Sequence, residues 1–326
     1  MNNLSKKQAC SVPVGTVIVG KWHKNKYKIK SLLGKGATGS VYLSESPTGL
    51  VAVKISDSSM SISSEVNVLK HFLKVQRSYL GPSLLDVDDW ERRGFDSPTA
   101  FYVMEYIKGE ALLQFIKRRG NEWIGILCLQ LLAELDILHR EGWVFGDLKP
   151  DNLLVTAPPP KIRLLDVGGT TLIGRSIKEF TEFFDRGYWG KGSRKAEPSY
   201  DLFAVAMIII NIAYPNRFSR SRNGGDQLKN AITSNVLLRK YSTVLENAIE
   251  GKYSSASNMR KDLLLVMNQQ YVSNKQTTTN QSTKSSSINN RRKGGKRSKK
   301  KSFLEFTLLF LVIIVVYWLY IYSQLL

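Results

Sequence analysis

The sequence from Gly34 to Val41, GKGATGSV, places three glycines where a chain could wrap around phosphate groups. Glycine lets the backbone approach a phosphate closely, whereas a side chain at the same place would collide with it. The run lacks the Gly-Lys-Ser/Thr ending of a P-loop, and it lies between two expected strands, which disfavours a dinucleotide-binding fold. Taken alone, the run is equally typical of an ordinary glycine-rich hairpin.

A lysine follows one strand later, at the end of VAVK, Val51–Lys54. A lysine in this place grips nucleotide phosphates while it pairs with a glutamate on the next helix. Glu65 is the natural partner, although its separation from Lys54 is short for such a pair. The alternative for Glu65 is a solvated acid that interacts favourably with the helix dipole.

Four further motifs follow in order along the chain: MEY, GDLKPDN, DVG and YDLFAVA. With the glycine run, Lys54 and Glu65, the sequence resembles the eukaryotic-type (Hanks-type) Ser/Thr protein kinases from about Tyr27 to Gln270. It is also similar, nearly end to end, to the YabT-like kinases of spore-forming bacilli, which are small and have a carboxyl-terminal anchor. The resemblance implies a two-lobed α+β fold and transfer of phosphate from ATP to protein.

The resemblance implies roles for the residues of GDLKPDN and DVG. Asp147 would accept or orient the proton of the substrate hydroxyl, and Lys149 would steady the transferring phosphoryl group. Asn152 and Asp166 would hold Mg²⁺ or Mn²⁺. Phosphoryl transfer needs mainly positioning and charge neutralisation, and these residue types supply both.

The resemblance also implies a nucleotide site, in which adenine lies against a hinge and between apolar side chains. Asp201, at the head of an apolar helix, is implied to hold the backbone of the catalytic loop. The residues implied for the ATP site are Leu33, Gly34, Gly36, Gly39, Val41, Ala52, Lys54, Glu65, Met104, Glu105, Tyr106, Ile107 and Leu154.

The chain departs from the family pattern just before the catalytic aspartate, where Phe145-Gly146 replaces His-Arg. An arginine there binds a phosphate on the activation segment through a bidentate, charge-assisted contact. Because Gly146 cannot do so, we expect activity not to depend on phosphate at the candidate positions, which are Thr170, Thr171, Ser176 and Thr181.

Two further departures concern the activation segment and the packing around DVG. The family's Ala-Pro-Glu stop is missing: KAEPSYD has the three residues scrambled and too close to Asp201, and position counting places GYWG near the stop. The family usually has a histidine at the position of Phe145 and an aromatic residue at the position of Val167. Here the aromatic residue lies in the loop and the D-x-G residue is smaller, either as compensation between packed neighbours or as independent drift.

The expected elements fit the two-lobed α+β arrangement. Strands are predicted within residues 26–46, 50–56 and 100–107, with one helix over 61–76 that Ser63 or Ser64 caps. A buried helix over 122–142, a hairpin over 152–169 and a helix over 199–214, apolar nearly all round, follow. Residues 1–26 are left as an amino-terminal extension before a kinase domain over 27–270.

The three histidines and two cysteines show no metal-site or disulfide spacing. Cys128 lies in an apolar helical run and is expected in the core, while nothing around Cys10 argues for a lipid. His23, His71 and His139 are expected to be ordinary surface or core residues.

The carboxyl-terminal part differs in composition from the rest. Residues 271–302 have no acid and almost no apolar content, which predicts a disordered linker. From Phe306 the chain gives about 20 apolar residues with interfacial aromatics, which predicts that residues 303–326 form a transmembrane anchor, with a buried soluble helix as the alternative.

The chain carries 47 Lys+Arg against 27 Asp+Glu, a net charge of +20. The linker holds Lys275 and Lys284 and a dense run made of Arg291, Arg292, Lys293, Lys296, Arg297, Lys299, Lys300 and Lys301. Such a run keeps its side of a membrane helix cytoplasmic, attracts anionic lipid and binds DNA phosphates without sequence preference.

We therefore expect a cytoplasmic kinase domain on a single-pass membrane anchor that autophosphorylates in trans and phosphorylates cytosolic proteins. A polyanion on the linker, either DNA or anionic lipid, is the expected activator, and the resemblance links the protein to sporulation. A catalytically silent scaffold that tethers DNA or partners at the membrane is the alternative.

Overall fold

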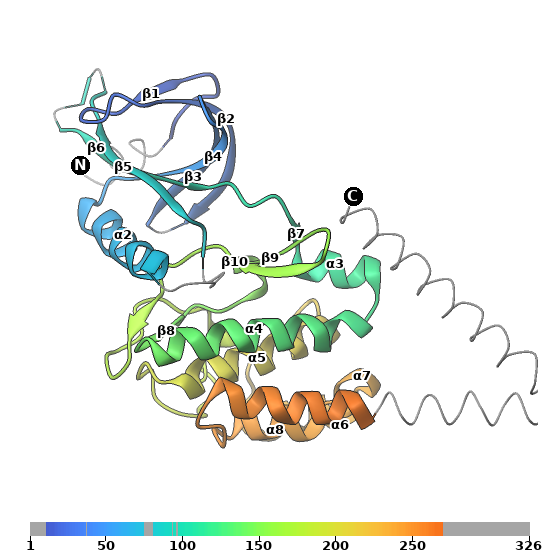
Figure 1. Cartoon of the computed structure of the whole chain (residues 1–326). Coiled ribbons are helices and arrows are strands. Elements are labelled where there is room, and N and C mark those ends of the chain that lie inside the picture. The colour runs from blue at the N-terminus through green and yellow to red at the C-terminus, as the bar shows by residue number, and fades with distance from the viewer. Residues whose placement is uncertain (1–10, 37, 75–80, 93, 96, 270–326) are drawn as a thin grey trace, which may run out of the picture. The chain divides into compact units, whose positions relative to one another are not determined.

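The structure is a computed structural model, and it describes residues 11–36, 38–74, 81–92, 94–95 and 97–269. The predicted linker and membrane anchor lie outside these residues. Among the helices that are described, none has both the length and the apolar character needed to cross a membrane. The described chain forms a small, mainly β lobe and a larger, mainly helical lobe (Figure 1).

The small lobe is built on a six-stranded sheet with the order β1-β2-β3-β4-β6-β5, in which every neighbouring pair is antiparallel. The β2–β3 hairpin carries the glycine run. Alternating buried residues such as Tyr27 and Ile29 turn one face of β2 to the core. The strands are β1 Val17–Val19, β2 Lys26–Gly36, β3 Gly39–Ser46, β4 Gly49–Ser56, β5 Leu84–Trp90 and β6 Thr99–Glu105.

The helix of the small lobe, α2, spans Ser59–Lys74 and packs against β4, β5 and β6. It begins earlier than the sequence predicted, because the Ser58 hydroxyl accepts a bond of 3.2 Å from the Ser61 amide. Ser63 and Ser64 therefore lie inside the helix, and the prediction that one of them caps it was wrong. The apolar periodicity starts only at Ile62, which hid the first turn.

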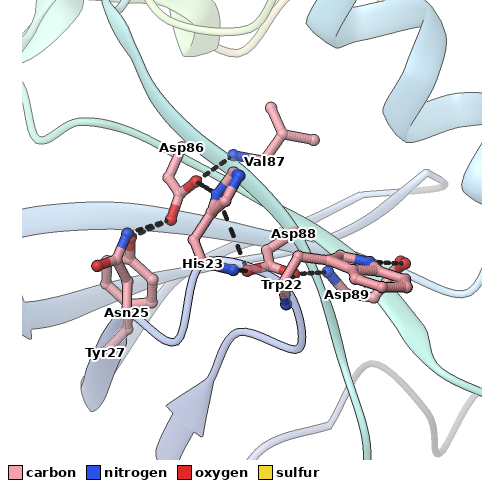
Figure 2. Close-up of polar contacts among 8 residues, drawn as sticks. All are labelled: Trp22, His23, Asn25, Tyr27, Asp86, Val87, Asp88 and Asp89. Carbon is pink, nitrogen blue, oxygen red and sulfur yellow. Dashed lines mark hydrogen bonds and ion pairs between the residues drawn. The ribbon is translucent and has the colours of Figure 1, made fainter.

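Residues 11–25 belong to the small lobe, although the sequence assigned them to an extension. Figure 2 shows the turn after β1 bound to β5: the Asp88 carboxylate accepts from the amides of Trp22 and His23, and Asp86 accepts from Asn25, Tyr27 and the His23 ring. Each carboxylate oxygen already has a donor from the chain, so the cluster stabilises the turn and is not an open cation site.

The large lobe consists mainly of helices around a buried central one. Its short strands include an antiparallel β9–β10 hairpin, as predicted, and a β8–β11 pair. The elements are β7 Glu110–Ala111, α3 Leu112–Arg119, α4 Glu122–Arg140, β8 Trp143–Val144, η1 Pro150–Asn152, β9 Leu153–Thr156, β10 Lys161–Leu164, β11 Thr171–Leu172, η2 Glu182–Phe184, α5 Pro198–Ala213, α6 Gly224–Ser234, α7 Val236–Arg239 and α8 Ser242–Ile249, and residues 256–269 are also helical.

The central helix α5 is buried from Tyr200 to Asn211, because its apolar residues cover the whole circumference and neighbouring helices enclose it. Its start explains the scrambled AEP stretch: Glu197 flanks the helix and Pro198 occupies its first turn, where a missing N–H costs nothing. Cys128 on α4 is buried, as predicted, and burial raises the pKa of its thiol to about 12.

Candidate active site

The structure brings Lys54 and Glu65 together in the interior of the small lobe. The Lys54 Nζ lies 2.6 Å from Glu65 Oε2, and their side chains are only 4% and 3% exposed. Glu65 is therefore not the solvated first-turn acid that was the alternative. A third group fixes the pair: Tyr102, the cross-strand neighbour of Lys54, donates its hydroxyl to Glu65 Oε2 over 2.7 Å.

The catalytic loop places Asp147, Lys149 and Thr181 in one hydrogen-bonded cluster. Lys149 Nζ bonds directly to Asp147 Oδ2, and it reaches the Thr181 hydroxyl at 3.1 Å. Thr181 in turn donates to Asp147 Oδ1 over 3.0 Å. Asn152 closes the loop by donating its side-chain amide to the Asp147 carbonyl oxygen over 2.8 Å.

A buried acid holds the backbone that leads into this loop. The Asp201 side chain is fully buried and accepts from the amides of Phe145 and Gly146, at 2.8 and 3.0 Å. His139 contacts the same carboxylate, with its Nε2 2.9 Å from Asp201 Oδ2. The contacts match the role that the resemblance implied for Asp201 and identify His139 as a core histidine.

Gly146 has a backbone that requires glycine. Its φ is +84°, a region that L side chains rarely adopt, and a Cβ built there would lie 2.6 Å from the Gly169 carbonyl oxygen. The catalytic loop thus packs backbone to backbone against the residues that follow DVG. An arginine cannot enter position 146 without moving one of the two loops.

The residues implied as metal ligands fit a divalent ion that prefers oxygen. The Asp166 side chain is 48% exposed, and its Oδ1 lies 3.7 Å from Lys54 Nζ. Asn152 uses its amide nitrogen on Asp147, which leaves the amide oxygen for coordination. A carboxylate and an amide oxygen are the ligand types that Mg²⁺ accepts, with water and phosphate oxygens completing its shell.

Between the lobes lies a pocket of about 390 Å³ with mostly apolar walls. The implied ATP-site residues that line it are Leu33, Gly34, Val41, Ala52, Lys54, Met104, Glu105, Tyr106, Ile107 and Leu154, together with Asn152 and Asp166. The implied residues that do not line it are Gly36, Gly39 and Glu65.

The three glycines of the run serve different purposes. A Cβ at Gly34 or Gly36 would meet nothing within 4 Å, so the fold itself does not demand glycine there, and the open space suits an incoming phosphate. A Cβ at Gly39 would lie 2.3 Å from the Ile55 carbonyl oxygen, and its φ is +148°. Gly39 therefore shapes the β3–β4 packing.

Glu105 contributes to the hinge through its backbone, because its side chain is engaged elsewhere. Arg163 donates to both of its carboxylate oxygens, at 3.1 and 2.9 Å. Burial, the largest single effect, opposes ionisation of this acid, but the contacts with Arg163 and Ser83 together outweigh it and the pKa of Glu105 lies below its ordinary value.

Sequence reasoning missed several residues of the site because no motif marks them. Tyr102 could have been found from its expected cross-strand position opposite Lys54. Glu179 is half-buried, and burial together with the nearby Asp166 carboxylate raises its pKa. The other pocket residues that were missed are Pro82, Gly109, Asp151 and Leu165.

The four candidate phosphorylation positions differ in accessibility. Thr170 and Thr171 are 0% and 1% exposed, and Thr181 is occupied with Asp147 and Lys149. Ser176 is exposed. An alanine at all four positions would therefore also damage the catalytic cluster, so Ser176 is the position at which phosphate dependence can be tested cleanly.

The GYWG stretch, Gly187–Gly190, occupies the region beyond Thr181. Trp189 is 1% exposed and packs edge-on against Phe183 and Phe218. The buried Asp185 accepts from the amides of Gly187 and Tyr188, so the turn is fixed without an Ala-Pro-Glu motif.

Comparison with known proteins is consistent with this geometry. The protein kinase domain family matches residues 27–286. The chain is 54% identical over 264 residues to the serine/threonine-protein kinase YabT of Bacillus subtilis (strain 168), which covers 81% of this chain and 78% of that protein. It is 30% identical over 153 residues to calcium/calmodulin-dependent protein kinase type 1 of Macrobrachium nipponense, covering 44% and 43%, and 25% identical over 196 residues to STE20 of Candida glabrata, covering 58% and 21%.

Proposed function

The chain belongs to the protein kinase family as a Ser/Thr kinase of the YabT-like, Hanks type, and on this premise we propose how its residues transfer phosphate from ATP to protein. Asp147 orients the substrate hydroxyl and accepts its proton. Lys149 stabilises the charge on the transferring group. Thr181 holds both side chains in place, because it bonds to each of them.

The nucleotide side of the reaction uses the other half of the site. Lys54, fixed by Glu65 and Tyr102, binds phosphate oxygens, and the pocket walls take the adenine. Asp166 and Asn152 hold Mg²⁺ or Mn²⁺, which supplies charge neutralisation on the phosphates when bound. Because these side chains are preorganised by the protein, little ordering remains for the moment of transfer.

The observation that carries this proposal is the shared contact of Thr181 with Asp147 and Lys149. A silent scaffold has no need for a threonine that aligns a base and a lysine. In the test, wild type and Asp147→Asn are incubated with radiolabelled ATP and a protein substrate. We expect Asp147→Asn to lower incorporation by about 10²–10⁴-fold, while Asp57→Asn, an exposed acid outside the site, retains it. Equal labelling in wild type and Asp147→Asn would contradict the proposal.

The finer part of the proposal places the kinase domain on the cytoplasmic face of the cell membrane. It is supported by the sequence of residues 271–326: a cationic linker and an apolar segment about as long as a bilayer core. Anionic lipid and DNA are the proposed partners of the linker, and clustering on DNA would raise the local concentration for trans-autophosphorylation. A role in sporulation is proposed from the similarity to YabT-like kinases of spore-forming bacilli.

A further inference from the structure

The first half of the activation segment is fixed by backbone pairing on two sides. The strand β11 pairs with β8, immediately before the catalytic loop. Residues 174–177 then pair with residues 194–196 through bonds of 2.7, 2.8 and 2.9 Å, and Ser176 faces Lys195 in an isolated bridge. These bonds join backbone groups, which the chain supplies whatever its state of modification.

Ile177 anchors the segment beside the catalytic loop. Its side chain is 8% exposed and packs with Val144, Ala196 and Tyr200. Its Cδ1 lies 3.5 Å from the position that a Cβ on Gly146 would occupy. An apolar side chain thus contacts the surface that an arginine would cover in relatives with His-Arg before the aspartate.

Lys178 extends the anchor to the small lobe. Its Nζ donates to the Thr170 carbonyl oxygen over 3.0 Å and to the Ser64 hydroxyl over 3.2 Å. Ser64 immediately precedes Glu65 on α2, and Glu65 is the residue that pairs with Lys54. One ammonium group therefore connects the activation segment, the chain after DVG and the helix that carries Glu65.

Three residues beyond Lys178 the segment reaches Thr181, which bonds to Asp147 and Lys149. Building on the kinase activity proposed above, we propose that Ile177 and Lys178 are positioning residues that hold Thr181 on the catalytic base without any phosphate on the segment. Ile177 supplies apolar packing in place of an arginine–phosphate contact, and Lys178 supplies the link to α2.

The energetic argument rests on burial. Ile177 buries nearly its whole side chain, whereas the hydrogen bonds of Lys178 to Ser64 and Thr170 are exposed or only partly buried and contribute little net free energy, so the apolar contact is the stronger part of the anchor. The Lys178 bonds are partly exposed, so they orient the segment more than they stabilise it. Loss of either residue frees the 177–181 stretch and misplaces Thr181, while the ATP pocket is built from other elements.

The test compares Ile177→Ala with Ile177→Val, and Lys178→Ala with Lys178→Arg, in the full-length protein after phosphatase treatment checked by mass spectrometry. We expect Ile177→Ala to lower kcat/KM for a protein substrate about tenfold or more, and Ile177→Val to retain most of it. Lys178→Ala should lower kcat/KM by about threefold or more, with partial recovery in Lys178→Arg. ATP affinity should stay within about twofold in all four variants, which a general loss of structure would not allow.

Ser176→Ala is the control for phosphate, because its exposed hydroxyl lies next to Ile177 and outside the catalytic cluster. It should keep wild-type activity. Loss of activity on phosphatase treatment of the wild type, or in Ser176→Ala, would overturn the inference. So would full activity in Ile177→Ala.

If Ile177→Ala loses ATP binding and melts early, Lys178→Ala decides, since that side chain is exposed. Unchanged kcat/KM in Lys178→Ala would then overturn the proposal. Failure of the kinase proposal would look different, because wild type and Asp147→Asn would then both be inactive. If wild type is active and the Ile177 and Lys178 variants are equally active, only the proposed role of these two residues is rejected.

Discussion

At the scale of single residues, Gly146 shows how one position ties control to backbone geometry. The missing arginine looked like a lost contact in the sequence. The structure adds that φ is +84° and that the Gly169 carbonyl fills the Cβ position. Loss of the arginine and close packing of the two loops are therefore one feature.

Gly146→Ala should destabilise the protein more than Gly142→Ala and should also lower activity. Both glycines have positive φ, +84° and +82°, but a Cβ at Gly142 would meet nothing within 4 Å. Gly142→Ala therefore measures backbone strain, about 1 kcal/mol, and the excess in Gly146→Ala measures the clash with Gly169. The free energies of unfolding from urea titration give the comparison, and equal values would show that Gly169 moves away without cost.

Residues that a motif marks were predictable, and residues that act only through a contact were not. Asp147, Lys149, Asn152 and Asp166 stand at fixed spacings because phosphoryl transfer constrains their types. Glu179 follows no such spacing, and its place depends on how the activation segment folds. The sequence named Thr181, but as a phosphorylation candidate, since its contact with Asp147 depends on tertiary structure.

At the scale of elements, β4, β6 and α2 meet at the Lys54–Glu65 pair, and Glu65→Gln should uncouple them. Removing one partner of a buried pair typically costs about 3–5 kcal/mol. We expect a smaller loss because Asp166 lies 3.7 Å from Lys54 and can take over part of its charge. Activity should fall more steeply, because Lys54 would then pair with Asp166, one of the implied metal ligands, and would no longer be held for the phosphates of ATP.

The control for this prediction is Glu110→Gln, which removes the Arg118 partner at a partly exposed site. Surface pairs contribute about 0–1 kcal/mol, so its melting temperature and kcat should stay near wild type. A Glu65→Gln protein with wild-type kcat/KM would show that Lys54 needs no fixed partner.

The turn that precedes β2 gives the small lobe a pH-dependent contact with β5. The hydrogen bond that the His23 ring donates to Asp86, and then the charge of Asp86, raise the pKa of His23 above its ordinary value, while burial has a minor opposing effect. Because the folded-state pKa is raised, the contact stabilises fully below the unfolded pKa, about 6.5, and the stabilisation is lost as pH rises through the folded value.

The difference in melting temperature between wild type and His23→Asn should therefore be largest just below the unfolded pKa of about 6.5. It should shrink as the pH rises through the folded pKa. Differential scanning fluorimetry at a series of pH values measures it. A difference that is constant with pH would mean that His23 contributes through its neutral hydrogen bond and not through its charge.

Strand β5 was missed by the sequence for a physical reason. β5, LLDVDDW, carries three acids, which argues against a strand in isolation. Its Asp86 and Asp88 are satisfied by the turn after β1, so tertiary contacts override the local preference. The long buried helices α4 and α5 were predictable because their apolar patterns can be recognised from the local sequence alone, without knowledge of tertiary contacts.

At the scale of the whole molecule, charge is distributed unevenly along the chain. Ten of the cations lie within residues 271–302, where there is no acid, and the net charge of the whole chain is +20. In the folded lobes, by contrast, many Lys and Arg side chains are paired, as are Arg163 with Glu105 and Arg186 with Glu197. Because the linker sequence contains no acid, we expect its charge to be available to a polyanion.

Binding of DNA to the full-length protein should weaken steeply with salt, and autophosphorylation should follow binding. Each neutralised phosphate contributes about −0.9 to the slope of log K against log salt concentration for B-DNA. Changing Arg291, Arg292, Lys293 and Lys296 to glutamine should reduce the magnitude of that slope by up to about 3.6. Changing four exposed lysines of the small lobe, Lys24, Lys26, Lys28 and Lys70, removes the same charge and should leave the slope nearly intact. Equal effects would assign the response to net charge and not to the linker, and anionic vesicles in place of DNA would show whether lipid uses the same residues.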